Sequence, residues 1–317
     1  NKPLNNEFYK YPIQVNEDAQ SYDNAYWDKN RHDSLSKHEL DAFSLVDTIK
    51  SLPIIGSYLD VFNIVFNGYL KVGKFSIGPY LSIYANNKFE GHRLRIGGKT
   101  NYHFSKKVFF DGYLAYGSED EKYKHKLGGR FILSRYPYIE TGLNWRNDLD
   151  QLGVNQIANN SAFSTITRWG SIIGPYYNQT KEGFFFAQLN KHISSKVTLR
   201  QQKINPLFNF NYYKSISSTE TFSEINTSEI EAKIKLAHNE GFLQTDYGRQ
   251  SLGSLKPEFT LTYTLGVKDV LKSDFNYQKI NLAMDHKIGF GVLGQSVMMF
   301  NIEKVFGTIP YPLLNIH

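Results

Sequence analysis

The amino-acid sequence predicts an all-β protein, a transmembrane antiparallel β-barrel of roughly twelve strands with a short helical lead-in. Three observations predict this class. Polar and apolar residues alternate with a period of two over long segments, the clearest of which covers residues 92–104. Tyrosine and phenylalanine, which favour strands, occur 22 and 23 times in 317 residues. No stretch approaches the ~20 consecutive apolar residues of a membrane helix, and only a closed barrel crosses a bilayer without one.

The first part of the chain differs from the rest, so we expect a lead-in over residues 1–66 and the barrel over residues 67–317. Ser36 followed by Glu39 matches a capping box, in which each side chain bonds the backbone N–H of the other residue. Apolar residues then recur at near-helical spacing: Leu40, Phe43, Val46 and Ile49. Pro53 is expected to end this helix, which would pack at the periplasmic mouth of the barrel or plug its lumen.

The alternating segments set the height of the predicted wall. At ~3.3 Å per residue, residues 92–104 span roughly 40 Å, which covers the ~25 Å apolar band of an outer membrane even when the strand tilts by about 40°. Similar alternation occurs over residues 122–133, 230–236 and 259–265. Weaker strand candidates are 75–84, 107–117, 137–146, 182–190, 195–203, 276–288 and 293–303. Residues 147–161 and 238–256 are expected to be long polar loops.

The cost of burying charge in lipid decides which face points where. A Lys or Arg on the lipid side at the bilayer midplane costs about 2–4 kcal/mol, so the basic faces should point into the lumen. The basic residues predicted to face the lumen are Arg93, Arg95, Lys99, Lys122, Lys124, Lys126, Arg130, Lys233 and Lys235. The residues predicted to face lipid or to form an interfacial aromatic girdle are Leu94, Ile96, Tyr102, Phe104, Tyr123, Leu127, Phe131 and Tyr263.

These lumen charges allow two interpretations. A basic lumen would favour anions in a transport pore. Alternatively, the cations pair with Glu140, Glu231 or a plug and only solvate the interior.

The sequence shows no recognisable active site, so neither an enzyme nor a cofactor is expected. The absence of Cys excludes thiolate zinc sites and a cysteine nucleophile, and the nine His residues lack metal-ligand spacing. The net charge of +6 is spread along the chain, so a nucleic-acid partner is not expected. The least favoured alternative is an outer-membrane hydrolase built on Asp285 and His286, with Ser296 on the next hairpin arm.

Four segments resemble a Bacteroidetes outer-membrane β-barrel family of unknown function. They are Tyr-Trp-Asp-Lys-Asn-Arg at 26–31, Glu-Gly-His-Arg-Leu-Arg-Ile-Gly-Gly-Lys-Thr-Asn at 90–101, Gly-Tyr-Leu-Ala-Tyr-Gly at 112–117, and the ending Phe-Gly-Thr-Ile-Pro-Tyr-Pro-Leu-Leu-Asn-Ile-His at 306–317. Members typically carry a carboxypeptidase-regulatory-like domain before this region and further strands after it. The resemblance therefore implies that this barrel is incomplete at its C-terminus, and it supplies no catalytic residues.

Together these features predict a non-enzymatic barrel of the bacterial outer membrane, a structural or accessory subunit of an envelope complex for protein assembly or export. Its expected partners are outer-membrane lipid, lipopolysaccharide and other envelope proteins. The resembled family is distantly similar to barrels that insert other proteins into the outer membrane. A porin-like pore with a basic lumen is the main alternative.

Overall fold

The structure, a computed structural model, describes residues 26, 29–30, 36–51, 68–152, 168–170, 172–213, 221–245, 248–254, 256–290 and 294–314. Helix α2 (Lys37–Ser51) begins directly after Ser36. The backbone N–H of Ser36 donates to the Glu39 carboxylate at 2.8 Å, and the N–H of Glu39 donates to the Ser36 hydroxyl at 3.4 Å. The predicted capping box is therefore confirmed, while Pro53 lies outside the described residues. No helix within the described part of the chain is long and apolar enough to span a membrane.

Within the described residues, one antiparallel sheet of 13 strands contains most of the chain. Its order is β1-β2-β4-β5-β6-β7-β8-β9-β12-β15-β16-β17, and β3 pairs with β4 off this path. These strands are β1 (Leu70–Val72), β2 (Phe75–Ile77), β3 (Tyr84–Asn87), β4 (Gly91–Thr100), β5 (Val108–Gly117), β6 (Tyr123–Arg135), β7 (Tyr138–Gln151), β8 (Pro175–Gln188), β9 (Ile193–Pro206), β12 (Ile225–Leu236), β15 (Glu258–Gly266), β16 (Tyr277–Gly289) and β17 (Gln295–Gly307). Separate hairpins join β10 (Tyr212–Tyr213) to β11 (Thr221–Phe222) and β13 (Gly241–Thr245) to β14 (Gly248–Gly253). Short 3-10 turns are η2 (Tyr80–Ser82), η4 (Val270–Lys272) and η6 (Tyr311–Leu313).

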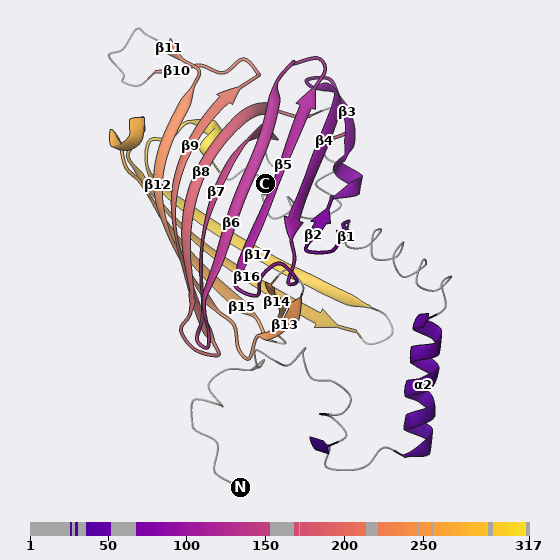
Figure 1. Ribbon diagram of the computed structural model, residues 1–317. Helices are drawn as coiled ribbons and strands as arrows, with labels where there is room; N and C mark the ends of the chain where they lie inside the picture. Colours follow the sequence, from indigo (N-terminus) through magenta and orange to yellow (C-terminus); the bar gives the residue numbers. More distant parts are fainter. Residues whose placement is uncertain are drawn as a thin grey trace.

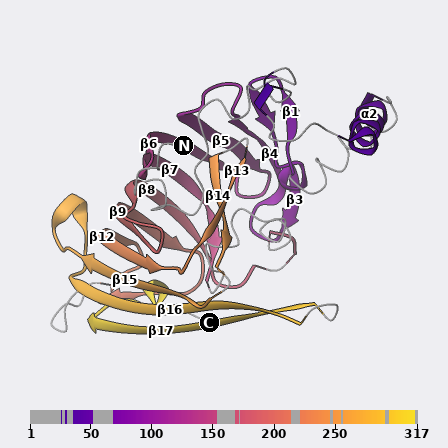
Figure 2. The same cartoon turned by 90° about the horizontal axis from the view of Figure 1, so that it is seen from below.

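The sheet curves into an arc (Figure 1). Seen from below, β4 to β12 form one side of the arc, and β15 to β17 turn across its end (Figure 2). The hydrogen-bonded path starts at β1 and ends at β17, so the sheet is open between these edges within the described residues. Strands β7, β8 and β9 have 14 residues each, far more than the roughly 5–6 of ordinary globular strands.

The two rims of the arc carry different connections. At the upper rim in Figure 1, β7 connects to β8 through residues 152–174 and β9 connects to β12 through residues 207–224. At the lower rim, β6 meets β7 through residues 136–137 and β8 meets β9 through residues 189–192. The lower rim also carries one long connection, residues 237–257 between β12 and β15, and the upper rim one short turn, residues 118–122 between β5 and β6. The other long connections named here lie at the upper rim, and longer loops on one side than on the other are typical of outer-membrane barrels.

Strand β4 is shorter than the alternation predicts. The side-chain amide of Asn101 donates to the carbonyl of Gly73 at 2.8 Å, and its amide oxygen accepts from the N–H of His103 at 3.0 Å. Such local side-chain bonds compete with the sheet ladder. The chain consequently leaves the sheet after Thr100, and the rest of the predicted segment up to residue 104 forms a turn.

The expected polar loop over residues 238–256 instead contains the β13–β14 hairpin, which lies inside the arc in Figure 2. The guanidinium of Arg249 lies 3.4 Å from the ring centroid of Phe242 and 5.0 Å from that of Tyr138 on β7. This cation–π pairing attaches the hairpin to the concave face of the sheet. We call that concave face the inner face and the opposite one the outer face.

Candidate functional site

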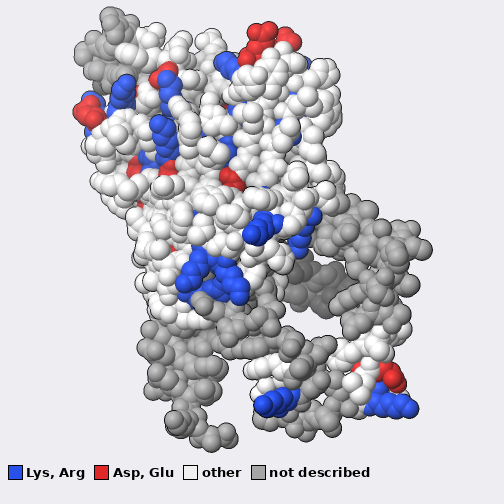
Figure 3. Space-filling model, in the orientation of Figure 1, with Lys and Arg blue, Asp and Glu red and all other residues white. Residues whose placement is uncertain are grey.

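The outer face presents apolar side chains on every long strand. Ile96 is 79% exposed and Leu143 is 69% exposed. Other outer-face residues with at least 40% exposure are Leu94, Leu114, Leu127, Phe185, Leu199, Ile230, Ile234, Leu261, Ile280, Leu282 and Ile302. Figure 3 shows that much of this face over β4–β8 is free of charged atoms, which gather toward its rims. Exposed apolar surface of this extent is unusual for a soluble monomer.

The inner face carries the charges, and its basic residues contact acids or aromatic rings. Ion pairs join Lys126 to Asp111 at 2.7 Å, Arg130 to Glu140 at 3.7 Å, Lys233 to Glu231 at 3.7 Å, and Lys235 to Glu240 and Glu258, both at 2.7 Å. Arg95 stands 3.8 Å from the ring centroid of Tyr113, and the Lys99 ammonium lies 3.7 Å from that of Tyr69. These six basic residues therefore each have an acidic or aromatic partner on the inner face.

Lys122 departs from its predicted inner position. It precedes the first residue of β6 and is exposed at the upper rim, where its ammonium lies 4.0 Å from the ring centroid of Tyr177.

The densest contacts form a cluster at the upper rim of the inner face. This rim cluster consists of Glu90, Arg93, Tyr113, Asp120, Lys124, Arg146, Asp148, Asp150 and Arg168. Asp148 lies at its centre and is 1% exposed. Arg93 donates to its carboxylate at 2.9 and 3.2 Å, and Arg168 donates at 3.3 and 3.2 Å. The hydroxyl of Tyr113 also donates to Asp148.

A second carboxylate, Glu90, is completely buried beside the first. It accepts from Arg93, and the Lys124 ammonium lies 3.1 Å away. Lys124 also donates to Asp120 in the β5–β6 turn at 2.7 Å. The cluster therefore holds four acidic and four basic side chains, which leaves it without net charge. Burial of charge is costly unless the charges are paired and hydrogen-bonded, and this arrangement meets both conditions.

The rim cluster fastens the long connection between β7 and β8 to the far side of the arc. The Asn87 amide donates to the carbonyl of Arg168 at 3.3 Å, and the N–H of Gly170 donates to the carbonyl of Asn86 at 2.9 Å. The rings of Trp169 and Tyr84 meet edge to face at 5.5 Å. Residues 168–170 thereby link β3 to Asp148 of β7, although β4, β5 and β6 lie between these two strands in the sheet. Its chemistry is that of a structural clamp.

Acid should weaken one corner of this clamp. Burial opposes ionisation of Asp120, but hydrogen bonds from Lys124 and from the Tyr177 hydroxyl outweigh it and lower the pKa of the carboxyl below its usual 3.8. A carboxyl whose pKa falls on folding stabilises the fold above its unfolded pKa, and that contribution disappears as the pH drops through the folded pKa. We expect the urea midpoint of the protein in detergent to fall below about pH 3.8, and to fall less in Asp120→Asn. An identical pH dependence in both proteins would contradict the role of Asp120.

The predicted outer residues lie as follows. Leu94, Ile96, Tyr123, Leu127, Phe131 and Tyr263 belong to strands and alternate with the inner residues. Tyr102 and Phe104 lie in the turn after β4, where the ring of Phe104 is 5.9 Å from that of Phe75 and 6.2 Å from that of Phe110. Outer aromatic rings also pair at the strand ends, as Tyr116 and Tyr123 do at 5.0 Å.

The structure does not assemble the hydrolase site considered from the sequence. Asp285 and His286 are consecutive residues of β16, so their side chains point to opposite faces of the sheet. Ser296 pairs with Ile288 rather than with His286. In the described part of the chain, no group of three or more His, Asp or Glu side chains is placed to hold a metal ion.

The sequence analysis missed the acidic half of the rim cluster. Residues 147–161 were expected to be a loop, whereas β7 continues to Gln151 and places Asp148 and Asp150 on its inner face. A usable signal was present, because Arg146, Asp148 and Asp150 alternate with a period of two. Arg168 carries no such signal, since it lies outside any strand.

The fold and its charged inner face define the class of protein: a single curved antiparallel sheet with an apolar exterior. Residues 61–306 match the C-terminal domain of a family of unknown function, DUF5686, and the chain therefore belongs to that family.

No protein of curated function matches this chain. One similar solved structure is BamA from Haemophilus ducreyi lacking POTRA domains 1-3, with 7% sequence identity and a TM-score of 0.44. That match covers 75% of this chain and 42% of the BamA chain, so this chain spans less than half the length of that protein. Membership of a family of unknown function is thereby confirmed, whereas the bacterial group and the regulatory-like domain stay predictions.

Proposed function

We propose that this chain forms part of a transmembrane β-barrel in the bacterial outer membrane, with a non-enzymatic role as a structural or accessory subunit of an envelope complex for protein assembly or export. The observation that carries the proposal is the inverted distribution of side chains, apolar outside and charged inside. Outer-membrane barrels show the same inversion, because lipid surrounds the wall and water fills the lumen. In a soluble protein, by contrast, the apolar face of a sheet is buried in the core.

The connections support an orientation in that membrane. Short turns face the periplasm in outer-membrane barrels, and longer loops face outward. We infer that the lower rim, with residues 136–137 and 189–192, is periplasmic. The upper rim and its clamp would then face the cell exterior, where residues 168–170, held by the rim cluster and by β3, offer a surface to a partner. Lipopolysaccharide and outer-membrane lipid would surround the outer face.

The pairing of inner charges favours this role over an anion-selective pore. Selectivity by charge requires cations that are free to attract the permeating ion. The rim cluster is electrically balanced, and Lys126, Arg130 and Lys235 have carboxylate partners of their own. Charge removal at these positions should therefore have little effect on the ion selectivity of conductance, because each cation is already matched by a carboxylate.

Co-purification tests the proposed role. The full-length protein, extracted from its own outer membrane in mild detergent, should bring a stoichiometric set of envelope proteins with it. An unrelated barrel of the same membrane, carrying the same affinity tag, serves as the control and should not recover that set. Recovery of this protein alone in every detergent tried would contradict the accessory role. Its absence from the outer-membrane fraction would contradict the proposed location as well.

A further inference from the structure

The outer face contains a groove of 1540 Å³ that runs across the strands from β2 to η4. Phe110, Leu127 and Leu143 line its middle, and Gly129 leaves its floor without a side chain there. At one end the Gln201 amide donates to the carbonyl of Leu271 at 3.0 Å, which holds η4 against the sheet as a wall. The volume exceeds the roughly 300–1,000 Å³ of ordinary small-molecule pockets, so the groove suits a long apolar ligand.

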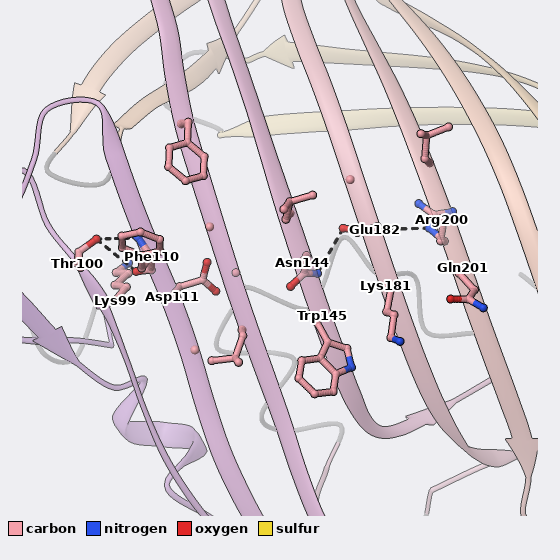
Figure 4. A pocket seen from close by; sticks show the side chains of 18 of the residues that line it. Lys99, Thr100, Phe110, Asp111, Asn144, Trp145, Lys181, Glu182, Arg200 and Gln201 are labelled. Atoms are coloured by element: carbon pink, nitrogen blue, oxygen red, sulfur yellow. Dashed lines mark hydrogen bonds and ion pairs between the residues drawn. The ribbon is translucent and has the colours of Figure 1, made fainter. Parts of the chain in front are cut away.

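The outer-face cation Lys181 projects into this mainly apolar groove. It lies on β8 directly opposite Trp145 of β7, and the two side chains hang side by side in Figure 4. Lys181 is exposed, and no carboxylate among the described residues lies within ion-pair distance of it. The neighbouring residue Glu182 points to the inner face, where it accepts from Arg200 at 3.4 Å. Lys181 therefore differs from the inner-face lysines that have acidic partners, namely Lys124, Lys126, Lys233 and Lys235.

Lys181 also marks a boundary along its own strand. The outer residues above it toward the upper rim are polar, namely Gln179 and Tyr177, whereas Gly183 and Phe185 below it are apolar. Tryptophan and lysine at such a boundary occupy the headgroup level of a bilayer. A lysine on the lipid side costs less free energy at this level than at the bilayer midplane, and a lipid phosphate at the same level would pair with its charge.

We propose that the groove binds an anionic phospholipid of the surrounding membrane, with an acyl chain against Phe110, Leu127 and Leu143 and the phosphate on Lys181. This inference rests on the proposed membrane insertion and adds a specific lipid site to it. Lys181 supplies charge complementarity to phosphate, and the apolar walls supply the contact for the chain. The nearest alternative occupant, a zwitterionic lipid, gains less from Lys181 because it carries no net charge.

The test uses the full-length protein reconstituted into vesicles of equal parts phosphatidylglycerol and phosphatidylethanolamine. After re-extraction in mild detergent, native mass spectrometry counts the lipids that stay bound. The wild type should retain phosphatidylglycerol in excess. Lys181→Gln should lower the ratio of the two retained lipids by about tenfold, as expected for loss of one charge-assisted hydrogen bond. Gly129→Leu should reduce retention of both lipids by filling the floor, where an added Cβ meets only ordinary contacts at 3.5 Å.

Lys304→Gln is the matched control, because Lys304 is an exposed lysine on the outer face of β17 and lies outside the groove. It should leave the ratio unchanged. An unchanged ratio in Lys181→Gln, or an equal fall in both lysine variants, would overturn the lipid site while leaving membrane insertion intact. If the wild-type protein fails to float with the vesicles, membrane insertion is contradicted, and both the proposed function and this lipid site are then rejected.

Discussion

Replacing Asp148 by asparagine is expected to lower the free energy of unfolding by about 3–5 kcal/mol, the usual cost of removing one partner from a buried ion pair. The substitution keeps the size of the side chain and removes its charge. Arg93 and Arg168, which donate two bonds each to this carboxylate, would then surround a neutral amide whose NH2 group is itself a donor. Urea titration in detergent, followed by tryptophan fluorescence, measures the change.

Asp111→Asn is the control for this prediction. Asp111 also pairs with a lysine on the inner face, at 2.7 Å from Lys126, but its side chain is 46% exposed. Exposed pairs contribute roughly 0–1 kcal/mol, so this variant should unfold close to the wild type. Equal losses in the two variants would show that burial of the rim cluster is not what stabilises it.

The strands were predictable where their two faces differ in chemistry. In β6 and β12, lysines point inward and Leu or Ile point outward, so the alternation is visible in the sequence. In β8 it vanishes, because Phe184, Phe185 and Phe186 are apolar on both faces. Phe184 lies under the Lys196 ammonium at 4.5 Å, and Phe186 packs against an inner cluster around Tyr138. A phenylalanine that contacts inner-face neighbours looks the same in sequence as one that faces outward.

The rim cluster was only half predictable for a different reason. The inward direction of Arg93 and Lys124 follows from strand parity alone. Their partners depend on register, since Arg93 reaches Asp148 across two intervening strands and 55 positions of sequence. Arg168 lies outside the strands, in the connection between β7 and β8, so no alternation in the sequence predicts its position. The alternation within one strand thus identifies which side chains share a face. Which acid pairs with which base depends on the order and the register of all the strands in the sheet.

Replacing Leu143 by arginine should destabilise the protein in lipid vesicles by about 2 kcal/mol, because a basic side chain facing lipid costs about 2–4 kcal/mol at the midplane and about 0–1 kcal/mol near the interface, and Leu143 lies one pleat repeat below the level of Trp145 and Lys181. Leu143 is 69% exposed on the outer face. If water surrounded that face, an arginine there would be harmless, because exposed surface substitutions usually change stability by less than about 0.5 kcal/mol. The sign and size of this effect therefore depend on the medium that covers the outer face. Urea-induced unfolding from vesicles, compared with the wild type, gives the difference directly.

Asn144→Arg provides the matched comparison, since Asn144 is the next residue of β7 and faces inward, where its amide donates to Glu182 at 3.4 Å. An arginine at that position has a carboxylate within reach and should be tolerated within about 1 kcal/mol. A large loss for Leu143→Arg together with a small one for Asn144→Arg requires lipid on one side of the wall and water on the other. Equal and small effects would mean that water bathes both faces, and the membrane assignment would fail. The two adjacent positions thus test the inverted distribution of side chains, on which the proposed function and the lipid site both depend.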